Sequence, residues 1–459
     1  MKFFLALWIA KLAEFAIKLI DPSRGTDFPG KAAYLIDKNF IRGFRTLNTD
    51  RVIFITGTNG KSTTTNLLYH TLKSAGKSVI ANLTGSNMLN GAASCLIAGS
   101  DWKGRIKADF ILIEVDERSF PYIIKQLPGK YMLITNIMQD QVHRNGDPDF
   151  IYQLLRKNIN PNMTLFLNND EPRSKSYETL ASEVYYFGVA KNPQSYQKDG
   201  IYDVTMPCPH CFSKIEFAYM NSANIGQFHC EYCGFRSSET ALTQAENIDF
   251  SNKSFVIRGT KHSMPYDVPI MLYNYAAVSA VANCLGISDE MVSESYGDFV
   301  NLEGRMDVLE YKGRQIRYLR IKQGNPETIQ MAVDAIALDN NPKTVAFGMC
   351  IIPERRPQWV PHYTNTYYAY EANFKPIKSE SIKMMIFSDY IAYDQLNRLS
   401  YDGFDPESIH VVESEDPKTV LDALCGMGEE TLYLIAPVRN IKLFKSYIKK
   451  TKGVGNETA

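Results

Sequence analysis

The sequence has no excess of charge of either sign, because 50 lysines and arginines balance 50 aspartates and glutamates. A general nucleic-acid binder needs a basic face that displaces counterions, so we expect no nucleic-acid partner. The sequence also lacks repeats and low-complexity tracts. Its composition, 45% hydrophobic and 22% charged, excludes a disordered or collagen-like chain. The length of 459 residues predicts about two to four folded domains.

Long apolar runs are missing as well. The N-terminal apolar run has eight residues and ends at Lys11, whereas a membrane-spanning helix needs about 20 apolar residues. Lys11, Glu14 and Lys18 follow at the spacing of one helical face, so we expect a helical segment over residues 1–50. Two interpretations are open for its first helix: it packs on the next domain, or it lies in a membrane interface.

The cysteines give little support for disulfide bonds. Four of the eight are isolated in the sequence, namely Cys95, Cys284, Cys350 and Cys425. Single thiols of this kind suit a reducing compartment, where they pack as small apolar side chains. We therefore expect a cytoplasmic protein, and the membrane-interface interpretation of the first helix would place it at the inner face of the membrane.

Short apolar segments alternate with helical stretches along most of the chain. This alternation predicts an α/β fold with a doubly wound parallel sheet. The expected strands are residues 51–55, 79–81, 110–113, 131–135 and 165–167, followed by 345–347, 384–387, 409–412 and 432–435. Helices are expected over residues 62–75 and 274–285.

Changes of pattern and composition predict the domain boundaries. We expect an N-terminal helical segment over residues 1–50, a central ATP-binding domain over 51–303, an insertion within it over 199–243, and a C-terminal α/β domain over 304–459.

A glycine-rich segment, Thr56-Gly-Thr-Asn-Gly-Lys-Ser-Thr63, separates the first strand from the next helix. Small residues let backbone N–H groups wrap a phosphate, and the helix N-terminus adds partial positive charge. Lys61 is expected to reach the β and γ phosphates, and Ser62 to ligate Mg²⁺. The predicted nucleotide contacts in this phosphate loop are Gly57, Thr58, Asn59, Gly60, Lys61, Ser62 and Thr63.

Two close cysteine pairs, Cys208/Cys211 and Cys230/Cys233, are separated by eighteen residues. This is the spacing of a zinc ribbon. Four thiolates close a tetrahedral site, so we expect the Zn²⁺ to be structural. A loop-rich insertion has little core of its own, and metal binding would supply its folding free energy.

The phosphate loop resembles that of the Mur ligases, which activate a carboxylate as an acyl phosphate and condense it with an amine. Further polar residues follow in the family's order: Glu114 ends an apolar strand, Asn136 ends the next, and His143 lies in the polar segment after it. The resemblance implies that Lys61, Glu114 and His143 are catalytic, and that Ser62 and Glu114 hold Mg²⁺.

Three later positions also match Mur ligase patterns. Asp170 lies in Asn168-Asn-Asp-Glu-Pro172, which resembles an Asn-x-Asp-Asp turn, and Asn274 resembles the asparagine that contacts adenine. Arg305 resembles the arginine of a Gly-Arg-x-Glu element. The resemblance implies that these residues bind nucleotide. It also implies a central P-loop domain with a parallel sheet and a C-terminal Rossmann-like α/β domain, with ATP, Mg²⁺ and Zn²⁺ as cofactors.

Within the Mur ligases, a four-cysteine ribbon resembles the MurT family, the synthetase subunits of lipid II isoglutaminyl synthase. Residues 7–13, 28–32 and 393–403 resemble the same family. The resemblance implies ATP-dependent amidation of the D-glutamate α-carboxyl of the lipid II stem peptide, in peptidoglycan biosynthesis. It implies a heterodimer with a GatD-like glutaminase that supplies ammonia. It also implies catalytic importance for position 365, where the family has the aspartate that completes the partner's Cys-His site.

The C-terminal domain departs from that family. Asn365 stands in place of the aspartate, and Tyr368 and Tyr370 replace a tryptophan pair. An amide cannot stabilise an imidazolium as a carboxylate does. Three hypotheses therefore stay open: a MurT-type synthetase with a glutaminase partner, a diverged ligase that uses free ammonia or another amine on another carboxylate, and a non-catalytic nucleotide binder. The retained Lys61 and Glu114 argue against the third.

Overall fold

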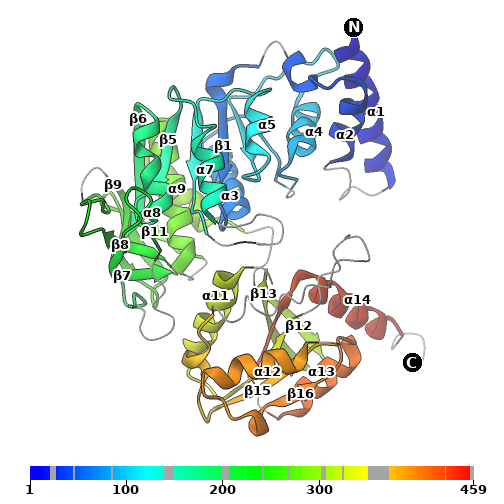
Figure 1. The fold of residues 1–459 in the computed structure, drawn as a ribbon. Coiled ribbons are helices and arrows are strands. Elements are labelled where there is room, and N and C mark those ends of the chain that lie inside the picture. The colour runs from blue at the N-terminus through cyan, green and yellow to red at the C-terminus, as the bar shows by residue number, and fades with distance from the viewer. Residues whose placement is uncertain are drawn as a thin grey trace. The chain divides into compact units, whose positions relative to one another are not determined.

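The computed structural model (Figure 1) describes residues 1–20, 27–44, 47–83, 86–138, 140, 148–197, 206–222, 224–239, 242–265, 269–300, 306–322, 325–349, 372–389, 391–428 and 431–454. These residues form two compact units. The first holds nearly all of the described residues up to 300, and the second holds those from 306 onward.

The first unit is built on a sheet of nine described strands in the order β11-β10-β9-β6-β5-β4-β1-β3-β2. Neighbouring strands from β2 to β9 run parallel, and β9, β10 and β11 pair antiparallel at one edge. The strands are β1 (Val52–Thr56), β2 (Val79–Ala81), β3 (Phe110–Glu114), β4 (Tyr131–Ile134), β5 (Thr164–Asn168), β6 (Glu183–Val189), β9 (Leu242–Asp249), β10 (Ser254–Ile257) and β11 (Thr260–Ser263).

Helices cover both faces of this sheet, so its central strands are buried on both sides. On one face, Val52 and Phe54 share an apolar core with α4 (Leu89–Gly99), α5 (Phe120–Ile124) and α7 (Pro148–Arg156). The other face is covered by α3 (Lys61–Ser74) and α9 (Pro269–Cys284), which pack on each other and on α10 (Asp289–Gly297). β1 lies between β3 and β4, so the loops that follow these three strands meet at one edge.

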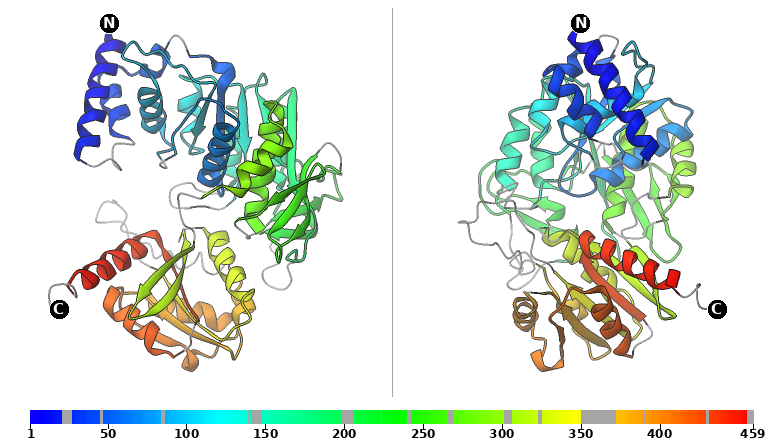
Figure 2. Two further views of the ribbon diagram at one scale, coloured as in Figure 1. Left: turned by 180° about the vertical axis from the view of Figure 1, so that it is seen from behind. Right: turned by 90° about the vertical axis from the view of Figure 1, so that its right-hand side faces the viewer.

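The N-terminal segment consists of α1 (Lys2–Ile20), α2 (Phe28–Ile36) and two 3₁₀ turns, Phe40–Gly43 and Thr49–Arg51. Figure 2 shows α1, in dark blue, beside α2 at the outer edge of the first unit. Ala6, Leu7 and Ala10 are fully buried in the core shared with α4. The structure thus confirms that the first helix packs on the next domain. Among the described residues, no helix is both long and apolar enough to cross a membrane.

The second unit has a sheet of six described strands in the order β12-β13-β17-β14-β15-β16. Only β12 is antiparallel to its neighbour. The strands are β12 (Met306–Tyr311), β13 (Arg314–Ile321), β14 (Lys343–Gly348), β15 (Ile382–Phe387), β16 (His410–Val412) and β17 (Thr431–Pro437).

Alternate side chains of these strands face two separate cores. Met384 and Ile386 of β15 share one core with α11 (Pro326–Ala337) and α12 (Ala392–Tyr401). The neighbouring Met385 and Phe387 face the other core, with α13 (Pro417–Gly426) and α14 (Val438–Val454). The predicted α/β class with parallel sheets is therefore confirmed.

Candidate functional site

The phosphate loop runs from the end of β1 to the start of α3, as the sequence predicts. Two glycines make its path possible. Gly57 has φ +124°, and a Cβ there would lie 2.2 Å from Thr135 Oγ1. Gly60 has φ +86°, and its Cβ would lie 2.6 Å from Asn274 Oδ1. Because L side chains rarely adopt these φ values, glycine allows both the turn and the close approach of its neighbours.

Lys61 begins α3 and folds back over the loop. Its Nζ donates hydrogen bonds to the carbonyl oxygens of Gly57 and Thr58, and it forms an ion pair with Glu117 Oε1 at 2.8 Å. Both side chains of the ion pair are almost completely buried. The cation is thus held at the N-terminal end of a helix, where the helix dipole also favours anions.

Ser62 and Glu114 come together, although they lie far apart in the sequence. Ser62 Oγ donates to Glu114 Oε1 at 3.1 Å, and Asn87 Nδ2 donates to the same oxygen at 3.3 Å. Asn82 fixes the backbone of Glu114, accepting from its N–H at 2.7 Å and donating to its carbonyl at 2.9 Å. A hydroxyl and a carboxylate in contact are hard oxygen ligands that suit Mg²⁺.

Asn136, just after β4, cross-links the phosphate loop. Its carbonyl accepts from Thr58 N–H at 2.8 Å, its Oδ1 accepts from Asn59 N–H at 2.9 Å, and its Nδ2 donates to Asn59 carbonyl at 3.0 Å. Thr135 Oγ1 donates to the same Asn59 carbonyl at 2.7 Å. The loop is therefore held in shape by the neighbouring strand end.

Asn274 in α9 also lies beside the loop. Its Oδ1 accepts from Thr64 Oγ1 in α3 at 3.1 Å, and it leaves no room for a side chain at position 60. The structure thus brings Lys61, Ser62, Glu114 and Asn274 to one place. The chemistry available there is a lysine, a hydroxyl–carboxylate pair and a helix N-terminus, which together suit a polyphosphate with its Mg²⁺.

Asp170 occupies a different environment. Its Oδ2 accepts from Val189 N–H and from Tyr273 OH, both at 2.9 Å, and its Oδ1 accepts from Asn169 Nδ2 at 3.3 Å. Burial raises the pKa of Asp170 to about 6, although these hydrogen bonds oppose the shift. The carboxyl group therefore connects β6 to α9.

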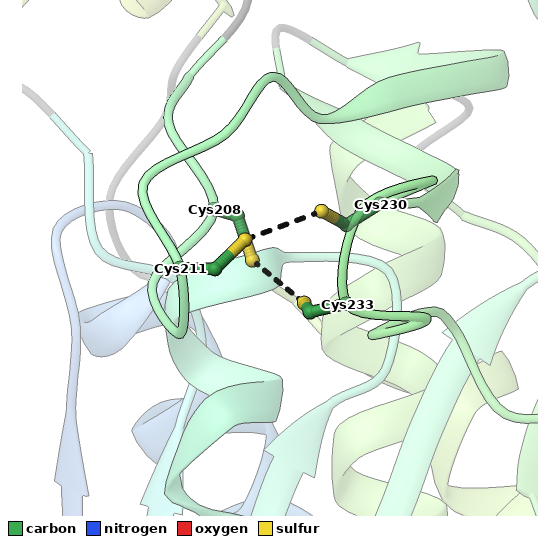
Figure 3. Close-up of side chains that lie close together, drawn as sticks. All are labelled: Cys208, Cys211, Cys230 and Cys233. Atoms are coloured by element: carbon green, nitrogen blue, oxygen red, sulfur yellow. Dashed lines mark hydrogen bonds between the residues drawn. The ribbon is translucent and has the colours of Figure 1, made fainter.

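The four predicted zinc ligands gather at one point (Figure 3). Cys208 Sγ lies 3.6 Å from Cys233 Sγ, and Cys211 Sγ lies 3.5 Å from Cys230 Sγ. All four sulfur atoms lie within 4.8 Å of one another. Tetrahedral thiolates at the usual Zn–S distance of about 2.3 Å would be about 3.8 Å apart, so the cluster fits one Zn²⁺.

The two cysteine pairs sit in matching turns. Cys208 carbonyl accepts from Phe212 N–H at 2.9 Å, and Cys230 carbonyl accepts from Gly234 N–H at the same distance. Phe212 and Gly234 both have positive φ, 63° and 75°. Each turn therefore wraps its first cysteine and aims both sulfurs inward, as expected for a metal-binding knuckle.

The hairpin between these turns, β7 (Glu216–Ser222) and β8 (Ile225–His229), attaches the cysteine cluster to the core. Asn221 Nδ2 donates to Val189 carbonyl at 2.9 Å and to Tyr273 OH at 3.1 Å. Gly226 N–H donates to Asp170 carbonyl at 2.9 Å. Tyr273 directly precedes Asn274, so the insertion and the phosphate loop contact the same turn of α9.

His143, Arg305 and Asn365 lie outside the described residues. The sequence interpretation missed Glu117 as the partner of Lys61. Glu117 could have been found from the sequence, because it lies three residues after Glu114, just beyond the end of the same strand. Asn82 and Asn87, which hold Glu114, carried no such signal because they lie in an irregular polar segment.

Family models match both halves of the chain. The Mur ligase middle domain matches residues 55–231, and the MurT ligase C-terminal model matches residues 323–437. The structure is similar to a pseudomurein peptide ligase type C from Methanothermus fervidus, with a TM-score of 0.65 and 20% identity. That match covers 89% of this chain and 80% of the other. This likeness shows the Mur ligase fold.

Two curated relatives are similar over most of their length. Lipid II isoglutaminyl synthase (glutamine-hydrolyzing) subunit MurT of Staphylococcus aureus (strain COL) is 26% identical over 383 residues, covering 83% of this chain and 84% of that protein. The subunit of the same name from Streptococcus pneumoniae (strain ATCC BAA-255 / R6) is 25% identical over 463 residues, covering 99% and 98%. The chain belongs to the MurT family of ATP-dependent, Mur ligase-type ligases.

Proposed function

We propose that this chain is the synthetase subunit of a lipid II isoglutaminyl synthase. It would use ATP to convert the α-carboxylate of D-glutamate in the lipid II stem peptide into an acyl phosphate, which ammonia then converts into the amide. The observation that carries the proposal is that the Lys61–Glu117 ion pair and the Ser62–Glu114 hydrogen bond lie together at the phosphate loop. The C-terminal half of the chain also matches the MurT model.

Each residue of the phosphate loop has a role in this proposal. Lys61 would leave Glu117 and neutralise the β and γ phosphates, while Ser62 and Glu114 would ligate Mg²⁺. When bound, Mg²⁺ would offset the negative charge that develops on the transferred phosphoryl group. Asn274 would face the adenosine part of the nucleotide. We retain His143 and Arg305 as proposed catalytic and nucleotide-binding residues.

The environment of Asp170 supports a positioning role. Its carboxyl group accepts hydrogen bonds from Val189 of β6, Tyr273 of α9 and the neighbouring Asn169, and it supports the turn of α9 that carries Asn274. Cys208, Cys211, Cys230 and Cys233 would hold a structural Zn²⁺, because four thiolates leave no open coordination position.

A GatD-like glutaminase is the proposed partner, bound through the C-terminal domain of residues 304–459. Both curated relatives are named as subunits of a glutamine-hydrolyzing enzyme. Asn365 stands where the family resemblance implies an aspartate for the partner's site. This substitution favours a second candidate function: a diverged ligase that takes free ammonia or another amine. The proposed location is the cytoplasm, at the inner face of the membrane.

The nitrogen source distinguishes the two candidates. Purified chain would be incubated with ATP, Mg²⁺ and lipid II, either with ammonium or with glutamine plus the glutaminase encoded beside its gene. Amide from both sources supports the synthase proposal. Amide from ammonium alone supports the diverged ligase, and Asn365→Asp should then restore use of glutamine. If neither source gives product while ATP binds, lipid II is not the substrate.

A further inference from the structure

The outer face of α1 is apolar over its whole length. Phe4, Trp8, Leu12, Phe15 and Leu19 form one ridge, and their side chains are 44%, 49%, 59%, 63% and 72% exposed. Leu5 and Ile9 extend the same face. At about 100° per residue, these side chains cover an arc of about 140° around the helix axis. We call this surface the α1 face.

Packing and hydrogen bonds on the inner side of α1 fix the orientation of the α1 face. The opposite side of α1 buries Ala6, Leu7 and Ala10, and Lys11 Nζ donates to the carbonyl oxygens of Ile97 and Ser100, both at 2.7 Å. These two carbonyls lie at the C-terminal end of α4 and just after it. The apolar ridge is thus fixed in its outward orientation rather than free to turn into the core.

Lysines border the α1 face on both sides. On a helical projection Lys18 and Lys11 lie along one edge and Lys2 along the other. The acidic residue of α1, Glu14, is paired with Lys18 at 2.6 Å. Trp8 Nε1 donates to the carbonyl of Trp102 at 2.9 Å, so two exposed tryptophans stand together at this surface. Tryptophan and lysine at the border of an apolar face are typical of the bilayer interface.

We propose that the α1 face docks on a membrane that contains anionic lipids, with α1 lying parallel to the surface. The ridge would enter the acyl-chain boundary, and Lys2 and Lys18 would contact phosphate headgroups, while Lys11 stays bonded to the end of α4. An apolar ridge edged by lysines complements a layer of acyl chains under anionic headgroups. The α1 face therefore matches a lipid surface better than it matches a protein partner. The proposal goes beyond the proposed ligase function and does not depend on its substrate.

The position of α1 gives membrane docking a consequence for the site. The C-terminal end of α4 contacts α1. The N-terminus of α4 follows Asn87, which contacts Glu114. Eleven residues of helix span about 16 Å. A docked α1 would therefore hold the phosphate loop within a few tens of ångströms of the lipid surface.

The test is co-sedimentation of the full chain with vesicles of phosphatidylcholine, with and without phosphatidylglycerol. Tryptophan fluorescence in brominated lipid provides a second readout of insertion. We expect binding to the anionic vesicles, weakened by salt, with quenching of tryptophan. The triple variant Leu12→Gln, Phe15→Gln, Leu19→Gln should bind about tenfold or more weakly. Lys2→Gln with Lys18→Gln should weaken binding to anionic vesicles only.

The matched control is Val308→Gln, Leu338→Gln, Tyr401→Gln, which removes three exposed apolar side chains from the second unit. It should bind vesicles as the wild type does. Unchanged melting temperature and zinc content would show that the α1 variant is folded. No vesicle binding by the wild type would overturn the proposal. Vesicle binding by the triple variant in α1 equal to that of the wild type would overturn it as well. A third contrary result would be a wild type that self-associates but does not bind vesicles, with the self-association lost in the triple variant.

Discussion

At the residue scale, the ion pair between Lys61 and Glu117 is the contact that ATP would have to rearrange in the proposed site. In the structure the lysine already has a buried anionic partner at 2.8 Å. A buried cation without a counterion is unfavourable, so Glu117 holds Lys61 in place, and bound phosphates would take over this role. The phosphate-loop spacing predicted Lys61, but the pairing required tertiary contact between the ends of β1 and β3.

Replacing Lys61 with alanine should reduce ATP turnover about a hundredfold or more, because the cation that neutralises the phosphates is lost. Turnover would be measured as phosphate release with substrate present. Lys73→Ala, which removes an exposed lysine from the same helix, should leave turnover unchanged. Zinc content should stay normal in both variants. Unaltered turnover in Lys61→Ala would refute the ATP-site assignment.

Glu117→Gln should lower the stability of the nucleotide-free protein by about 1–3 kcal/mol, because Lys61 then lacks its buried counterion. A non-hydrolysable ATP analogue with Mg²⁺ should restore most of that loss, since its phosphates supply the missing negative charge. Thermal melting with and without the analogue measures both effects. An equal loss in both conditions would mean that Lys61 does not contact the nucleotide.

Asp170 should make stability depend on pH. Its folded-state pKa of about 6 lies above the ordinary value of 3.8. Between these values the unfolded chain releases its proton first, so the free energy of unfolding decreases as pH rises from about 4 to 6. The decrease is on the order of 2–3 kcal/mol. Denaturant unfolding of the Asp170→Asn variant should not show this pH-dependent decrease. The control variant Asp50→Asn, at an exposed position, should still show it. Identical pH profiles for wild type and Asp170→Asn would contradict the assignment.

At the element scale, apolar runs predicted the buried parallel strands well. β2 spans the expected residues 79–81, and β14, β15, β16 and β17 overlap their expected ranges. These strands read as continuous apolar runs because both faces are covered. The hairpin β7–β8 was not predicted. Its pairing contains irregularities near Phe217 and Met220 that break the two-residue alternation.

The insertion should support nucleotide binding through its contacts with Asp170 and α9. Cys211→Ser should remove the bound zinc and weaken ATP-analogue affinity roughly fivefold or more, because Asn221 and Gly226 no longer hold the turn beside Asn274. Zinc analysis and calorimetry measure the two quantities. Cys425→Ser, outside the insertion, should change neither. Zinc loss with unchanged affinity would show that the insertion and the phosphate loop are independent.

At the scale of the whole molecule, each unit has its own sheet and its own cores. The sequence alone led to the family and the fold class, because motif order and apolar periodicity survive divergence to about a quarter identity. The outward apolar face of α1 was harder to predict. The sequence left its two interpretations open, and in the structure α1 buries one side while exposing the other.

The most direct test of the central claim follows an oxygen atom. Lipid II whose D-glutamate α-carboxylate carries the heavy isotope of oxygen would be incubated with the chain, ATP, Mg²⁺ and ammonium. An acyl-phosphate route transfers one labelled oxygen to inorganic phosphate for each amide formed. We predict labelled phosphate in equal amount to amide, and neither product with Lys61→Ala. Amide formed without labelled phosphate, or no amide from lipid II while ATP is bound, would contradict the proposed function.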